Sequence, residues 1–143
     1  MPYLVDSDIL IDHLATVKEA NQLLERLAPE GIAISIITYM EAYQGISRSP
    51  QQRNAHEKFQ AFLTTVPILP FSLPVAERCA KLREQLKREG KRVNARALDL
   101  LNAAIALESN LIMVTRNRPG ADIRVTRRKV AVTGSESGWR GGV

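Results

Sequence analysis

The sequence predicts an α/β fold of three layers, in which helices cover both faces of a central parallel sheet of four to five strands. Short apolar runs rich in β-branched residues alternate along the chain with longer segments whose apolar residues recur at helical spacing. Two of the short runs end abruptly in polar residues, and ligands of open parallel sheets gather at that end of a strand. A chain of 143 residues, 45% of them hydrophobic, is long enough to bury the core of one such domain.

The strands are expected at 3–5, 32–36, 66–71 and 111–114, and prolines in the third place it at an edge of the sheet. The helices are expected at 9–14, 18–28, 52–63, 73–89 and 95–108, with one more after Thr38 that ends before Gly45. Residues 1–132 are expected to form the domain, with a last short strand at 129–132. Residues 133–143 are glycine-rich without an apolar period, and we expect a disordered tail there.

The composition indicates a cytoplasmic protein. The single cysteine, Cys79, cannot form an internal disulfide, so nothing points to an oxidising compartment. No apolar run approaches the roughly 20 residues that a membrane span needs. No basic segment precedes an apolar core at the amino terminus, so neither a membrane association nor a signal peptide is expected.

Positive charge is concentrated in two parts of the chain. Residues 115–143 hold seven Lys or Arg against two Asp or Glu, which accounts for the whole net charge of +5. A second basic cluster at 78–96 is partly offset by glutamates. Such clusters suit an anionic partner such as nucleic acid, but a solvated helix face with i,i+4 pairs such as Glu84 and Arg88 explains the second one equally well.

Two acidic residues are candidates for a functional site, and each also has a structural interpretation. Asp6 directly follows the first strand, where a ligand would bind, but an Asp at this place is also a good N-cap for the next helix. Glu41 lies three residues after Thr38, which is the spacing of a capping box.

A third acid, Asp99, lies inside a segment that is apolar on nearly every face. A helix over 97–107 is therefore expected to be buried on several sides, with Asn102 one turn after Asp99 on the same face. A buried carboxylate is costly unless it is neutralised, hydrogen-bonded or bound to a cation. The alternative is an Asp in the first turn that interacts with the helix dipole.

If the first and fourth strands are neighbours, these acids and the polar residues Thr115 and Asn117 converge on one edge of the sheet. Carboxylates gathered in this way raise one another's pKa unless a cation is present. Oxygen ligands without His or Cys suit Mg²⁺, with Mn²⁺ as the alternative. The chemistry that such a site predicts is metal-assisted hydrolysis of a phosphodiester.

The chain resembles the PIN-domain ribonucleases, and most closely the VapC-type toxins of bacterial toxin–antitoxin pairs. Order and spacing agree over about residues 1–117, and the matching residues are Val5 to Asp12, Ile34, Ser35, Thr38, Glu41, Gly45, Asp99 to Leu101, Ala103, Ala104, Ala106, Leu107 and Val114 to Asn117. The resemblance implies a PIN-like nuclease domain with Mg²⁺-dependent endoribonuclease activity on cellular RNA such as tRNA. It also implies a homodimer and a cognate antitoxin.

The resemblance implies a role for each matching polar residue. Asp6 and Asp99 would hold the metal, and Glu41 would complete the acidic site as the general base. Thr115 and Asn117 would position the site or bind the phosphate, and Asp8 would support the metal ligand. The apolar residues that are expected to receive the antitoxin, although core or dimer contacts explain them equally, are Ile37, Tyr39, Met40 and Tyr43.

The chain departs from the family pattern after Asn117. The family commonly has Thr-x-Asn-x-x-Asp-Phe here, whereas this chain has Gly120 in place of the acid and no following Phe. Asp122 is the nearest candidate for a fourth acid, but it is out of register. One hypothesis is that this terminus has been replaced, so that the fifth strand and the fourth acid are missing.

Two other classes of function stay open. One is a PIN-like module that binds RNA through its arginine-rich surfaces but is catalytically impaired without the fourth acid, although three intact acids argue against it. The other is a DNA nuclease or flap-type nuclease with the same acidic site, although the chain has no additional DNA-clamping element. A Rossmann dinucleotide enzyme is excluded, because no glycine-rich turn follows the first strand.

Overall fold

The computed structural model of the protein describes residues 2–90, 97–115, 128–131 and 140–141. Within them, six strands form one sheet in the order β3-β2-β1-β4-β5-β6. The strands are β1 (Tyr3–Val5), β2 (Ile32–Ser35), β3 (Ile68–Leu69), β4 (Ile112–Thr115), β5 (Arg128–Ala131) and β6 (Arg140–Gly141). The first five are parallel to their neighbours, and β6 is antiparallel to β5.

The centre of the sheet agrees with the sequence-based expectation. Tyr3 of β1 is in register with Ile32 of β2 on one side and with Ile112 of β4 on the other. The first and fourth strands are therefore neighbours, which is the condition set above for the acids to converge, and the expected edge position of β3 is confirmed. This arrangement brings the carboxyl ends of β1, β2 and β4 together.

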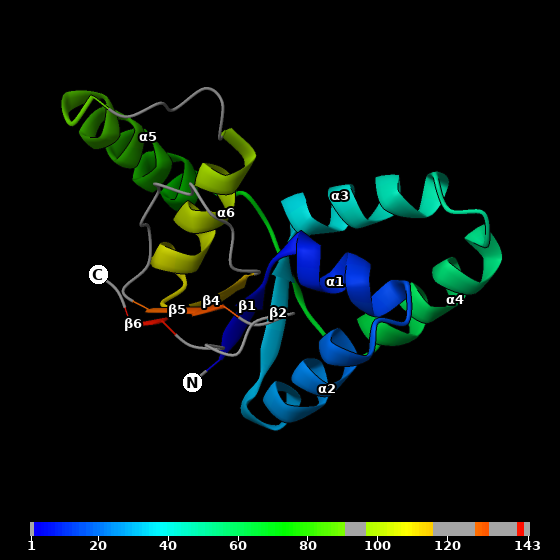
Figure 1. The fold of residues 1–143 in the computed structure, drawn as a ribbon. Coiled ribbons are helices and arrows are strands. Elements are labelled where there is room, and N and C mark those ends of the chain that lie inside the picture. Colours follow the sequence, from blue (N-terminus) through cyan, green and yellow to red (C-terminus); the bar gives the residue numbers. More distant parts are fainter. Residues whose placement is uncertain (1, 91–96, 116–127, 132–139, 142–143) are drawn as a thin grey trace.

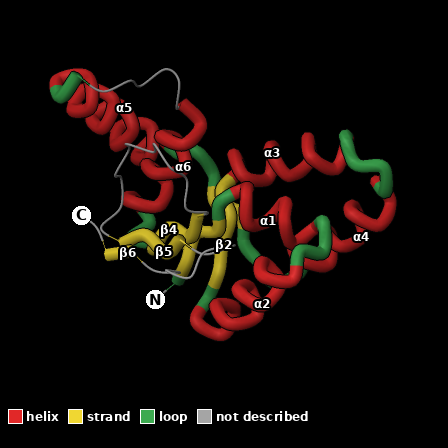
Figure 2. The backbone as a smooth tube through the Cα atoms, viewed as in Figure 1, coloured by secondary structure: helices red, strands yellow, loops and turns green. Residues whose placement is uncertain are grey.

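Helices cover both faces of the sheet, which confirms the three-layer α/β/α architecture (Figures 1 and 2). On one face lie α1 (Ser7–Leu14), α2 (Lys18–Leu27), α3 (Ile36–Ser47) and α4 (Gln52–Leu63), with the short 3-10 helix η1 (Ala28–Glu30) after α2. On the other face lie α5 (Leu73–Arg88) and α6 (Ala97–Glu108). No helix in the described part of the chain is long and apolar enough to cross a membrane.

Successive residues of a strand point to opposite faces of the sheet, so the apolar residues of each strand are divided between two cores. Val5 and Val114 pack with α1, α2, α3 and α4 in the first core. Their neighbours Leu4 and Met113 pack with α5 and α6 in the second. Each core therefore fixes a different set of helices on the same three central strands.

Several element boundaries differ from expectation because side chains cap the helices. Asp6 caps α1, so this helix begins at Ser7 rather than Ile9. Ser35 caps α3, so β2 ends at Ser35 rather than Ile36 and the expected cap, Thr38, lies inside the helix. The third strand is reduced to Ile68–Leu69 between its flanking prolines.

The fifth strand is present at Arg128–Ala131, within one residue of the short strand expected at 129–132, so the hypothesis that it is missing is wrong. β5 pairs with β4 over Met113–Thr115, and this pairing satisfies backbone groups that an edge of the sheet would leave exposed. Within the expected disordered tail, Arg140–Gly141 form β6, because they pair with β5 in turn. The other residues of 133–143 lie outside the described residues.

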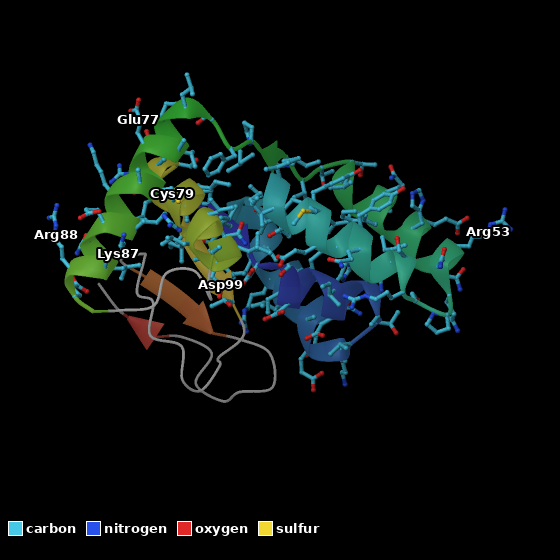
Figure 3. The ribbon with its side chains drawn as sticks, turned by 90° about the horizontal axis from the view of Figure 1, so that it is seen from above. Arg53, Glu77, Cys79, Lys87, Arg88 and Asp99 are labelled. Atoms are coloured by element: carbon cyan, nitrogen blue, oxygen red, sulfur yellow. The ribbon has the colours of Figure 1, made fainter. Side chains whose placement is uncertain are left out.

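Two arginines of the basic cluster on α5 form ion pairs with glutamates. Arg88 approaches Glu84 at 3.7 Å in the expected i,i+4 pair, and the Arg88 side chain extends away from the molecule (Figure 3). Arg78 contacts Glu108 at 3.2 Å and so links α5 to α6. For these two arginines the solvated-face interpretation holds.

Candidate active site

Asp6 lies where β1 leaves the sheet and α1 begins. Its backbone N–H donates to the carbonyl of Val114 at 2.9 Å, which holds the residue beside the end of β4. The Asp6 Oδ1 accepts the N–H of Ser7 at 2.7 Å, and Oδ2 accepts the hydroxyl of Thr115 at 2.8 Å. Asp6 is therefore a helix cap and also a half-buried carboxylate oriented at the carboxyl edge of the sheet.

Glu41 is half-buried on α3, in the turn after the capped end. The Ser35 Oγ accepts the N–H of Thr38 at 3.0 Å, so Thr38 is not the cap and the capping-box interpretation of Glu41 is wrong. The Glu41 side chain is instead hydrogen-bonded to the side chain of Ser7 on α1. Glu41 thus faces the element that Asp6 begins.

The pKa of Glu41 is raised above its usual value of 4.5. Burial is the largest cause, the negative charges of Asp6 and Asp99 add to it, and the hydrogen bond with Ser7 acts in the opposite direction. Carboxylates influence one another's pKa in this way when they are close. The three acids, which come from three different elements, therefore form one acidic site.

Asp99 lies in the first turn of α6 and is exposed, so the expectation of a buried carboxylate is wrong. The buried face of the helix begins one residue later, at Leu100, and Asp99 turns away from it. The alternative, an acid in the first turn near the helix dipole, describes its position. Figure 3 shows Asp99 between α5 on one side and α1 and α3 on the other.

The position of Asn102 on the face of Asp99 is predictable from the sequence, but its part in the site is not. Its amide is buried on α6, where it accepts a hydrogen bond from the hydroxyl of Ser35 and donates to Asp6 Oδ1 at 3.4 Å. It also donates to Thr38 Oγ1 at 3.5 Å. A polar residue within the most apolar helix of the chain was the signal that could have singled it out.

A family model for the PIN domain matches residues 3–124. This chain belongs to the PIN-domain family. It is 31% identical over 121 residues to ribonuclease VapC2 of Rickettsia felis, a match that covers 82% of this chain and 87% of the relative. The resemblance to VapC-type PIN domains is thereby confirmed.

Solved structures agree with this assignment. VapBC2 from Rickettsia felis bound to a DNA fragment from its promoter contains a chain that matches this PIN domain with a TM-score of 0.71 and 29% identity, over 82% of this chain and 88% of that one. A toxin–antitoxin complex from Klebsiella pneumoniae matches with a TM-score of 0.63 and 33% identity, over 80% and 86% of the two chains.

The remaining predicted residues of this PIN domain have different outcomes. Thr115 contacts Asp6 directly, as described above. Asp8 is half-buried in the first turn of α1, two residues from Asp6. Asn117 and Asp122 lie outside the described residues, although the family match extends past both.

The donor chemistry of the acidic site fits a hard divalent cation. Its acids offer only oxygen ligands, and a cation would neutralise the negative charges of Asp6 and Asp99, which add to the effect of burial on the pKa of Glu41. Among the described residues, no three His, Cys, Asp or Glu side chains are gathered closely enough to bind one ion together. Mg²⁺ commonly uses only one or two carboxylates and fills its other positions with water and phosphate oxygens, so a pair of ligands is sufficient.

Proposed function

We propose that this PIN domain is a Mg²⁺-dependent endoribonuclease that acts as the toxin of a VapBC-type pair in the cytoplasm. The observation that carries the proposal is the placement of Asp6 at the carboxyl end of β1, where Thr115 and Asn102 hydrogen-bond to it and where its charge, with that of Asp99, acts on Glu41. The relative named ribonuclease VapC2 supports RNA as the substrate class. A structured RNA such as tRNA is the target we favour.

Each acid has a distinct task in this proposal. Asp6 and Asp99 hold Mg²⁺, or Mn²⁺ in its place, and the bound cation supplies a Lewis acid for the scissile phosphate. Glu41 accepts a proton from the attacking water at its carboxylate, and burial, the largest cause of its raised pKa, makes that carboxylate a better proton acceptor. The hydroxyl of Thr115 keeps Asp6 in the orientation that the metal site requires.

We also propose a cognate antitoxin as the partner, since the similar solved structures include toxin–antitoxin complexes. The face of α3 that would receive it carries three exposed apolar residues at helical spacing, Ile36, Met40 and Tyr43. Of the residues expected from the sequence, Tyr39 and Ile37 pack against the two cores instead. We also propose that this chain forms a homodimer through exposed apolar surface.

The decisive experiment is cleavage of total cellular RNA by the purified protein with and without Mg²⁺. Asp6→Asn and Asp99→Asn should each abolish metal-dependent fragments, whereas Glu25→Gln, which changes an exposed acid on α2, should leave them unchanged. Circular dichroism and thermal unfolding establish that every variant is folded. Parallel reactions with single-stranded and flap DNA measure the preference for RNA.

The outcomes separate the three classes of function. Discrete RNA fragments that need both the metal and the two aspartates support the ribonuclease. A wild-type protein that binds RNA but never cuts it, with any divalent metal, is the impaired binding module. Faster cleavage of DNA or of flap substrates identifies the other nuclease class.

A further inference from the structure

Asn102 is a buried polar residue in a helix face that is otherwise apolar. Its exposed fraction is 2%, and the residues that follow it, Ala103 to Ala106, are buried hydrophobics of the second core. Burial of an amide without hydrogen bonds is costly, so a residue of this kind needs partners. The partners of Asn102 are Asp6 of the acidic site and two buried polar residues at the start of α3, Ser35 and Thr38.

The orientation of the Asn102 amide follows from the chemistry of its partners. The Ser35 Oγ already accepts the N–H of Thr38, so its own hydrogen is free to be donated, and it is donated to Asn102 Oδ1. The carboxylate of Asp6 can only accept, so the Asn102 NH₂ group faces it, at 3.4 Å from Oδ1. The same NH₂ group donates to Thr38 Oγ1 at 3.5 Å.

One amide thus connects two helix caps, of which Asp6 is itself one of the acids and Ser35 begins the helix that carries Glu41. Asp6 is the N-cap of α1, Ser35 is the N-cap of α3, which carries Glu41, and Asn102 itself lies one turn after Asp99 on α6. The negative charges of Asp6 and Asp99 repel the carboxylate of Glu41, which adds to the effect of burial on its pKa. Contacts between their elements are needed to hold them at the spacing that catalysis requires.

We propose that Asn102 is a positioning residue that orients Asp6 and sets α3 and α6 at the spacing of the acidic site. The inference rests on the proposed function, since it assigns Asn102 a task in the same reaction. Leucine keeps the branch at Cγ and the number of side-chain heavy atoms of asparagine, with bulkier methyl groups, but it can neither donate to Asp6 nor accept from Ser35. Asn102→Leu therefore removes the connection while it leaves the packing of α6 nearly filled.

The test measures kcat and KM on an RNA that the wild type cuts, together with Mn²⁺ affinity by electron paramagnetic resonance in the absence of RNA. Outer partners of metal ligands change affinity or activity by about 10-fold to 100-fold, and we expect Asn102→Leu to lower kcat and Mn²⁺ affinity by that amount with little change in KM. The matched control is Ile105→Ala, which removes a fully buried side chain from the same helix. Measured well below its melting temperature, it should keep the wild-type kcat and Mn²⁺ affinity.

Asn102→Ser keeps the test decisive if the leucine variant does not fold. Its hydroxyl is too short to reach Asp6 and Ser35 together, so kcat and Mn²⁺ affinity should fall in the same direction. Wild-type values in a folded Asn102 variant, or an equal loss of kcat in Ile105→Ala, would overturn the inference. A wild-type protein that neither cuts RNA nor binds Mn²⁺ would instead overturn the proposed function.

Discussion

The hydroxyl of Thr115 donates to Oδ2 of Asp6 at 2.8 Å and so joins the ends of β4 and β1. The two residues are far apart in the sequence, and the parallel register of Val5 with Val114 brings them together. Because the other carboxylate oxygen is held by Ser7, this hydroxyl fixes the second half of the Asp6 side chain.

Thr115→Val should therefore lower cleavage activity although it removes only one oxygen. We expect kcat to fall by about 10-fold to 100-fold, as for other hydrogen-bonding partners of metal ligands. Thr115→Ser restores the hydroxyl and should recover most of the rate. If valine and serine variants cut RNA equally fast, the hydrogen bond to Asp6 has no role in catalysis.

Glu41→Gln should abolish cleavage while it stabilises the metal-free fold. A general base contributes about 10²-fold to 10⁴-fold to the rate, and Gln cannot accept the proton. The pKa of Glu41 is raised in the folded state, so ionisation of this group opposes folding once the pH exceeds its unfolded value near 4.5. Removing the carboxylate should thus increase Tm at pH 7, by no more than about 3 °C for a half-buried group.

The pH dependence of the Tm difference between wild type and Glu41→Gln tests this explanation. Below the unfolded pKa, Glu41 is protonated in both states, so the Tm difference between wild type and Glu41→Gln should vanish as the pH falls below 4.5. Differential scanning calorimetry with a chelator present measures it. A Tm difference that is negative at pH 7, or one that is the same at pH 4 and pH 7, contradicts the electrostatic account of the site.

Much of this site could be predicted because the sequence marks the end of each strand by a change from apolar to polar residues. The apolar run at Tyr3–Val5 ends at Asp6, and the run at Leu111–Val114 ends at Thr115, so parallel pairing of the two strands is sufficient to bring their polar ends together. The helical period of Leu73 to Arg88 likewise gave α5 to within one residue. These features depend on local patterns.

The features that the sequence does not predict correctly depend on the folded chain rather than on a local pattern. Thr38 and Ser35 are both good caps, and only the backbone of the folded chain decides that Ser35 accepts the hydrogen bond. The exposure of Asp99 was missed because an apolar composition does not reveal which side of the first turn faces the core. The contacts of Asn102 with Ser35 and Asp6 span 67 and 96 residues, and no local pattern encodes them.

Met40→Asp should weaken antitoxin binding and leave RNA cleavage by the free protein unchanged. Met40 is 48% exposed on α3, one turn from Tyr43, which is 45% exposed, so a charge there costs the fold little and disrupts an apolar contact surface. We expect at least about a 10-fold loss of affinity, the usual effect of a central interface residue. Isothermal titration calorimetry with the purified antitoxin measures it.

Two controls define what the Met40 result means. Leu73→Asp introduces the same charge at an exposed apolar residue of α5 and should not affect antitoxin binding. Tyr39→Asp should lower stability and activity together, because Tyr39 packs against Phe59 at a ring separation of 5.3 Å. If Met40→Asp converts a dimer to a monomer with unchanged antitoxin affinity, this face of α3 is the dimer contact instead.

Removal of β5 should damage the acidic site although no residue of that strand belongs to it. Ala131 of β5 is in register with Thr115, and this pairing holds the end of β4 from which the Thr115 hydroxyl reaches Asp6. A chain that ends at Arg127 leaves the backbone of β4 unpaired on that side, which costs stability and favours aggregation through the exposed edge. We expect its Tm to fall by at least about 3 °C and its cleavage rate to fall with it. The control is a chain that ends at Ala131, which keeps β5 and removes β6. Identical Tm values and rates for the two truncated chains would show that β5 does not support the end of β4.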